Sequence, residues 1–205
     1  MGLLPGAMTA LVVIGATTAV LASLVMTTRV SVKVALAWST AAQMGFMLLG
    51  LTAGVVGGNT LSAGNAYSSA MFYVFSYVLM TLAAFGVLLV LSRAGFDAET
   101  LEDLKGLNKR SSWFAGMMAI VMFSMAGIPF FIGFYAKFSV LLAVVASGYK
   151  WLAVFAVMMS LIGAFYYLKL IRVMFFEKPE SDISQINPDR GPWVLLDQGE
   201  QLLDI

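Results

Sequence analysis

The stretch SMAGIPFFIGFYAKF, residues 124–138, decides how this sequence folds. It lies inside an apolar segment of 37 residues, 111–147, in which Lys137 is the one charged side chain. A continuous helix of that length would extend about 55 Å, whereas the hydrocarbon core of a bilayer is about 30 Å thick. Pro129 removes a helix hydrogen bond and clashes with the preceding turn. The sequence therefore predicts a helix that breaks near Gly127 and Pro129.

Two interpretations of this broken segment remain open at this point. Gly133 lies just beyond the proline and loosens the same region of backbone. The segment is either one discontinuous crossing of a membrane or two short spans.

Composition places the rest of the chain in a membrane as well. Of 205 residues, 60% are hydrophobic and 11% are charged, whereas a soluble domain carries about 25% charged residues. A net charge of +1 offers no strong field to nucleic acid or to acidic substrates. Cysteine and histidine are both absent, which excludes disulfides, thiolate metal sites and the commonest general base. The sequence predicts an all-α, polytopic transmembrane bundle without a metal or cofactor site of its own.

About 20 apolar residues of helix cross a bilayer, and this length sets the expected spans. Helices are expected over residues 7–27, 34–56, 67–92 and 150–176 in addition to the broken segment, with a glycine-rich loop over 57–65 and a polar loop over 93–110. The last helix has aromatic residues toward both ends, which is typical of interfacial belts. They are Trp151 at one end, and Tyr166 and Tyr167 toward the other. We expect a transmembrane domain over residues 1–178 and a polar tail over 179–205.

Positive charge favours a single broken crossing over two short spans. Short loops rich in Lys and Arg stay in the cytoplasm. With one broken crossing, every loop cation falls on one side except Lys150, whereas two crossings would divide the cations seven against four. We therefore expect five crossings of a bacterial inner membrane, with a discontinuous fourth helix. The N-terminus would lie outside, and the tail would lie in the cytoplasm.

Lys137 is the residue most suited to carry chemistry. An ionised lysine at the centre of a membrane costs at least about 2.5–3.5 kcal/mol. Burial disfavours the charged form, and a helix break brings water and freed carbonyls within reach. These features indicate a proton-exchanging amine; the alternative is a lysine that snorkels to the interface.

Other polar residues are candidates for a proton path. Lys33 begins the second expected helix and is either a proton-path residue or a cytoplasmic anchor. The polar side chains on the second and third helices could hold a chain of water molecules or could bond neighbouring helices to each other. The candidates for the water path are Ser39, Thr40, Gln43, Tyr73 and Tyr77.

Several short motifs resemble the antiporter-like subunits of the respiratory NADH–quinone oxidoreductase and their Mrp antiporter relatives. They occur in the family's order: KVALAWST at 33–40 with QMGF at 43–46, TLAAFG at 81–86, LEDLKGL at 101–107, the segment 124–138, and AFYYL at 164–168. The resemblance covers about residues 7–178. The chain departs from the family pattern at Val34, at Gln43 and at Phe130, where the family has arginine, histidine and a second proline.

The resemblance implies a fold of two inverted five-helix repeats, of which this chain matches the second. It places Lys137 at the lysine of the broken helix, which passes protons toward the outer side. It also implies partners: other membrane-arm subunits, with NADH, FMN, iron–sulfur clusters and quinone bound in subunits other than this one. The first repeat is missing, so the sequence has the appearance of a fragment. The alternatives are a subunit of an Mrp-type cation/proton antiporter and a non-catalytic, truncated membrane bundle.

Overall fold

The computed structural model describes residues 5–53, 60–93 and 98–178. Within these ranges the chain is helical, and its one β-type contact is an isolated bridge between Ser31 and Thr100. The prediction of an all-α membrane fold is confirmed, with four helices long and apolar enough to span a bilayer. The helices are α1 (Pro5–Thr28), α2 (Val32–Ala53), α3 (Thr60–Arg93), α4 (Leu107–Arg110), α5 (Ser112–Ala126), α6 (Ile132–Ala146) and α7 (Lys150–Phe176).

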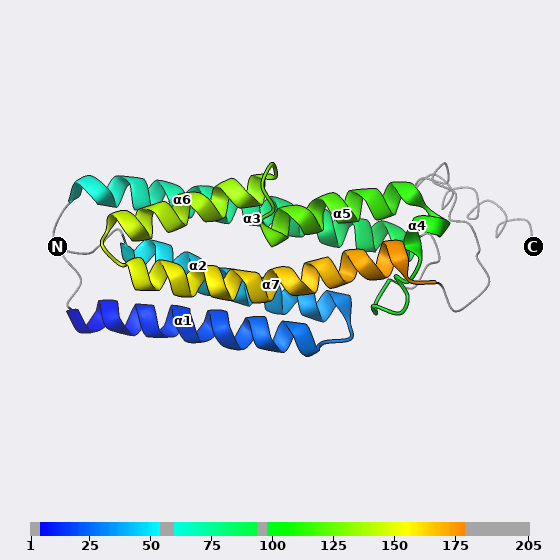
Figure 1. The fold of residues 1–205 in the computed structure, drawn as a ribbon, viewed down its shortest axis with the longest axis horizontal. Coiled ribbons are helices and arrows are strands. Elements are labelled where there is room, and N and C mark those ends of the chain that lie inside the picture. Colours follow the sequence, from blue (N-terminus) through cyan, green and yellow to red (C-terminus); the bar gives the residue numbers. More distant parts are fainter. Residues whose placement is uncertain (1–4, 54–59, 94–97, 179–205) are drawn as a thin grey trace, which may run out of the picture.

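The long helices run side by side along the long axis of the molecule (Figure 1). α5 and α6 lie end to end beside α3, as two halves of one interrupted rod. Each half has 15 residues, fewer than the 17–25 that a transmembrane helix needs. α3, with 34 residues, is long enough to run beside both halves. The geometry is that of a discontinuous helix rather than a hairpin of two short spans.

One expected boundary is wrong. α3 begins at Thr60, so Gly64 and Asn65 are helical, whereas the sequence predicted a glycine-rich loop up to residue 65. A single glycine in a helix costs only about 1 kcal/mol relative to alanine, and the surrounding residues are compatible with a helix. The rest of the expected loop and the expected polar tail from residue 179 lie outside the described residues.

Small residues allow α1 and α2 to pack closely. A Cβ atom added to Gly45 of α2 would lie 2.6 Å from the carbonyl oxygen of Gly15 in α1. Lipid supplies no hydrophobic force between helices, so close backbone approach of this kind replaces it. Large apolar side chains such as Leu21, Met71 and Phe75 are exposed on the outer faces, as expected of surfaces that contact lipid.

A polar loop ties three helices together at one end of the bundle. The Val32 N–H donates to the Glu99 carbonyl at 2.8 Å, the Leu101 N–H donates to Val30 at 3.2 Å, and the Gly106 N–H donates to Val173 at 3.2 Å. The α1–α2 turn and the end of α7 therefore meet the loop at the same end. This is the end at which the described loop cations gather, while Lys150 lies at the opposite end, at the start of α7 (Figure 1).

Candidate functional site

The break between α5 and α6 is built by a left-handed glycine. Gly127 has φ +83°, a conformation that residues with a side chain rarely adopt. The Ile128 N–H donates to the Phe123 carbonyl at 3.1 Å, and the Gly127 N–H donates to the Ser124 carbonyl at 3.0 Å. This pair of bonds is a Schellman motif. It satisfies two of the four carbonyls that a helix C-terminus leaves without partners.

The other two carbonyls of α5 are satisfied by Lys137. Its Nζ lies 2.9 Å from the Met125 oxygen and 3.3 Å from the Ala126 oxygen. Lys137 stands in the second turn of α6 and is 8% exposed. The C-terminal end of a helix carries partial negative charge, which favours a cation there. The lysine of one half-helix therefore completes the hydrogen bonding of the other half.

The third partner of the amine is a hydroxyl on α7. Lys137 Nζ donates to Ser160 Oγ at 2.9 Å. Neither Lys33–Glu99 nor Lys105–Glu102, the ion pairs found in the described part of the chain, involves Lys137. The partners of the amine among the described residues are therefore neutral dipoles. The sequence did not predict Ser160, although it is the one hydroxyl residue in the otherwise apolar stretch 151–165.

Close packing holds the two half-helices at this junction. A Cβ atom on Gly133 would lie 1.8 Å from the Ser124 carbonyl oxygen, so only glycine fits there. The Gly133 N–H donates to Ser124 Oγ at 3.2 Å, and that hydroxyl donates to the sulfur of Met80 on α3. Pro129 lies between the two half-helices. Gly127, Pro129 and Gly133 therefore all lie at the break.

Phe130 shows how this junction departs from the family pattern. Its φ is +83°, and its side chain is 94% exposed. Proline is fixed near φ −65°, so the second proline of the family motif could not adopt this backbone.

The candidates for the water path form a connected cluster between α2, α3 and α7. Ser39 Oγ lies 2.8 Å from the Tyr77 hydroxyl and also hydrogen-bonds the Tyr167 hydroxyl. The Tyr77 hydroxyl donates to Thr40 Oγ1 at 3.5 Å. The Tyr73 hydroxyl donates to the Gln43 side-chain oxygen, and Gln43 also hydrogen-bonds the Tyr167 side chain, which joins the two groups.

Tyr167 was missed because it was assigned to an interfacial belt. Tyr166 is 1% exposed and Tyr167 is fully buried, so that assignment is wrong for both residues. Both tyrosines face inward because they pack against α2, α3 and α5 rather than the membrane surface. Trp151, 87% exposed at the start of α7, does have the exposure expected of a belt residue.

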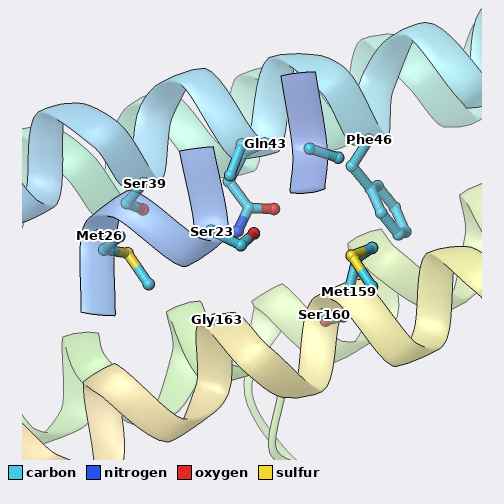
Figure 2. Close-up of a pocket in the computed structure, with 10 residues that line it drawn as sticks. Ser23, Met26, Ser39, Gln43, Phe46, Met159, Ser160 and Gly163 are labelled. Carbon is cyan, nitrogen blue, oxygen red and sulfur yellow. The ribbon is translucent and has the colours of Figure 1, made fainter. Parts of the chain in front are cut away.

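A small, partly open cavity lined by both polar and apolar residues lies between α1, α2 and α7 (Figure 2). Its polar lining residues are Ser23, Ser39, Gln43 and Ser160, and its apolar lining residues include Met26, Phe46 and Met159. The space open to the centre of a water molecule is about 10 Å³, close to what a single water requires. The hydroxyl that contacts Lys137 therefore also lines this cavity.

Lys33 has a different environment. It stands in the first turn of α2, its side chain is 42% exposed, and its Nζ lies 3.5 Å from Glu99 Oε1. Ion pairs this exposed contribute at most about 1 kcal/mol. The geometry favours the anchor interpretation of Lys33.

The fold and the site together define a class: a multi-pass α-helical membrane protein with a buried lysine on a discontinuous helix. The model of the family "NADH:quinone oxidoreductase/Mrp antiporter, TM" matches residues 3–163, and the chain belongs to this family.

Individual proteins agree with this membership. The chain is 62% identical over 160 residues to NADH-quinone oxidoreductase subunit N of Azoarcus sp. (strain BH72), covering 78% of this chain and 33% of that one. It therefore spans about a third of that relative's length. Respiratory complex I of Thermus thermophilus contains a chain of similar fold, with a TM-score of 0.71, 28% identity, and coverage of 95% of this chain and 42% of the other.

The Mrp complex of Dietzia sp. DQ12-45-1b contains a chain with the same fold. Its TM-score is 0.71 at 24% identity, with coverage of 90% of this chain and 34% of the other. At that identity the likeness concerns the fold alone.

Proposed function

We propose that this chain is part of a proton-translocating membrane subunit, of the subunit N type, in an NADH–quinone oxidoreductase. The observation that carries the proposal is the Lys137 amine, buried at the helix break and held by two carbonyls and one hydroxyl without a described carboxylate partner. A carboxylate left behind would strongly oppose loss of the proton, whereas neutral dipoles oppose it much less. An amine with these partners is suited to gain and release a proton.

The chain would take no part in electron transfer. Among the described residues no three metal-ligating side chains gather into a group, and the sequence contains neither cysteine nor histidine for an iron–sulfur cluster. NADH, FMN, iron–sulfur clusters and quinone would be bound by partner subunits. Their redox energy would reach Lys137 through neighbouring membrane-arm subunits.

The proposed topology has five crossings in the bacterial inner membrane. α1, α2, α3 and α7 each cross, and α5 with α6 crosses once, because these halves lie end to end (Figure 1). The end that holds the polar loop would face the cytoplasm. The N-terminus would then lie outside.

A cation/proton antiporter of the Mrp type is the second candidate. The shared fold favours it, since the same lysine could exchange protons under an ion gradient. Copurification separates the two candidates, because flavin- and iron–sulfur-containing partners would identify the oxidoreductase.

The test is proton uptake by inside-out membrane vesicles that contain the assembled complex, driven by NADH. We expect Lys137→Ala to lower uptake on the order of tenfold or more at equal subunit level. Lys169→Ala, which removes an exposed lysine from α7, is the control and should stay within twofold of the unmodified complex. Unchanged uptake in Lys137→Ala would overturn the proposal and favour a non-catalytic bundle.

A further inference from the structure

The partners of Lys137 differ in what they can do when the amine loses a proton. An ammonium has three N–H donors, and the structure supplies three acceptors: the Met125 and Ala126 carbonyls and Ser160 Oγ. A neutral amine has two N–H donors and one lone pair, so one partner must then donate to nitrogen. A carbonyl cannot donate. Of these three partners only the Ser160 hydroxyl can reverse its hydrogen bond.

The same hydroxyl contacts the amine and also lines the cavity between α1, α2 and α7. Ser160 faces the cavity from α7, while Ser23 and Gln43 approach it from α1 and α2 (Figure 2). Ser23 is 3% exposed and lines the cavity with Gln43. A cavity of this size with several polar groups on its wall can hold one ordered water.

We propose that Ser160 relays the proton of Lys137, and that one water molecule bound in the cavity beside Ser23 and Gln43 is the donor or acceptor beyond it. This inference rests on the proposed function, since it deepens the role of Lys137. The inference assigns Ser160 of α7 as the relay residue and places a water site between α1, α2 and α7.

The proton transfer needs no reactant other than this water molecule. When Lys137 discharges, an N–H bond of the ammonium breaks and its electron pair remains on nitrogen. That proton joins Ser160 Oγ, while the hydroxyl's own proton passes to the water. The products are a neutral amine, a neutral serine that now donates to nitrogen, and a hydronium ion that leaves through the cavity. Recharging is the reverse sequence.

The sharpest test is a pair of variants of equal shape. Ser160→Thr keeps the hydroxyl, and Ser160→Val replaces it with a methyl group. We expect Ser160→Thr to keep NADH-driven proton uptake within about twofold of the unmodified complex. Ser160→Val should lower it on the order of tenfold, the low end of what a proton-transfer group contributes. Subunit level in the membrane, measured by immunoblot, should be equal for the pair.

Two further variants separate the relay from its surroundings. Ser139→Ala is the control, because the Ser139 hydroxyl bonds only the Ala136 carbonyl of its own helix, α6; uptake should stay unchanged. Ser23→Ala removes one of several polar groups around the water, so a two- to threefold loss is expected, smaller than for Ser160→Val.

Each outcome decides one of the two proposals. If Lys137→Ala abolishes uptake while Ser160→Val pumps normally, the relay is overturned and the proposed function stands. If Ser160→Thr and Ser160→Val lose uptake equally, Ser160 is a packing residue and the relay is again overturned. If Lys137→Ala itself pumps normally, the proposed function fails and the relay fails with it. A loss in Ser160→Val with retention in Ser160→Thr supports the relay.

Discussion

Two lysines of this chain lie in opposite environments. Lys33 stands at the solvated end of the bundle, half-exposed and paired with Glu99. Lys137 is buried at the helix break, where its partners are two carbonyls and a hydroxyl. The Lys33–Glu99 pair is exposed to solvent, so it contributes at most about 1 kcal/mol. The Lys137 amine is out of reach of bulk solvent, so its interactions are made with the protein. The difference in burial and partners is the reason for assigning the proposed proton exchange to Lys137 and an anchoring role to Lys33.

The largest effect is expected from a substitution that forces the two half-helices apart. Gly133→Ala places a methyl group 1.8 Å from the Ser124 carbonyl oxygen, so the backbone must shift. We expect a loss of at least about 2 kcal/mol of stability, as for severe overpacking. The midpoint of thermal unfolding of the purified complex measures it. Gly116→Ala in α5, where nothing lies within 4 Å of the added atom, should be neutral or stabilising. Equal midpoints for the two variants would contradict the packing described.

Two glycines with similar backbone conformations test whether the position of the Lys137 amine matters. Gly127 and Gly148 have φ +83° and +88°, so alanine at either position meets a similar strain of about 1–2 kcal/mol. Only at Gly127 would the new methyl group contact Lys137, 3.1 Å from Cδ and 3.4 Å from Nζ. We expect Gly127→Ala to lower proton uptake severalfold and Gly148→Ala to stay within twofold. Similar losses in both would show that strain, rather than displacement of the amine, is responsible.

We expect only a small effect from removing the exposed lysine, Lys33. Lys33→Ala removes an exposed ion pair worth at most about 1 kcal/mol, so proton uptake should stay within about twofold. The vesicle assay used for Lys137 measures this directly. A loss as large as that of Lys137→Ala would place Lys33 on the proton path.

The smallest effect concerns the loop that Glu99 belongs to. Partial burial raises the pKa of the Asp103 carboxyl, but the hydrogen bonds from the Thr100 and Glu99 N–H groups outweigh it, and the pKa lies below the usual 3.8. A lowered folded-state pKa means that the carboxylate stabilises the loop above about pH 4, and that this stabilisation is lost as the pH falls through the folded-state value.

Hydrogen exchange measures that effect. The protection of the Glu99 and Thr100 amides, corrected for intrinsic exchange rates, should be lower at pH 3 than at pH 6. Asp103→Asn, which cannot titrate, should remove this difference. A pH dependence that persists in the variant would assign it to another group.

The sequence was sufficient to predict the features that depend on local chemistry. Gly127 and Pro129 marked the end of α5, and the length of the apolar segments predicted the spanning helices. Lys137 was singled out because an isolated charge in an apolar run is costly anywhere. The sequence also predicts its burial and its place near the break, and the structure adds the two carbonyls and the hydroxyl that it contacts.

The partners of these residues could not be predicted, because they come from distant helices. Ser160 lies 23 residues after Lys137 and has no feature of its own beyond a hydroxyl. Tyr167 was assigned to the interface, although it faces Ser39, 128 residues earlier in the chain. Hydrophobic periodicity does not reveal which face of a helix is buried when both lipid and protein neighbours are apolar.

Proton uptake per NADH oxidised by Lys137→Gln tests the central claim most directly. The amide keeps two N–H donors for the α5 carbonyls but cannot exchange a proton at physiological pH. We expect the variant subunit to assemble at no less than half its normal level while uptake per NADH falls on the order of tenfold. Uptake within twofold of the unmodified complex would contradict the account, since hydrogen bonding at the break would then suffice without a titrating amine.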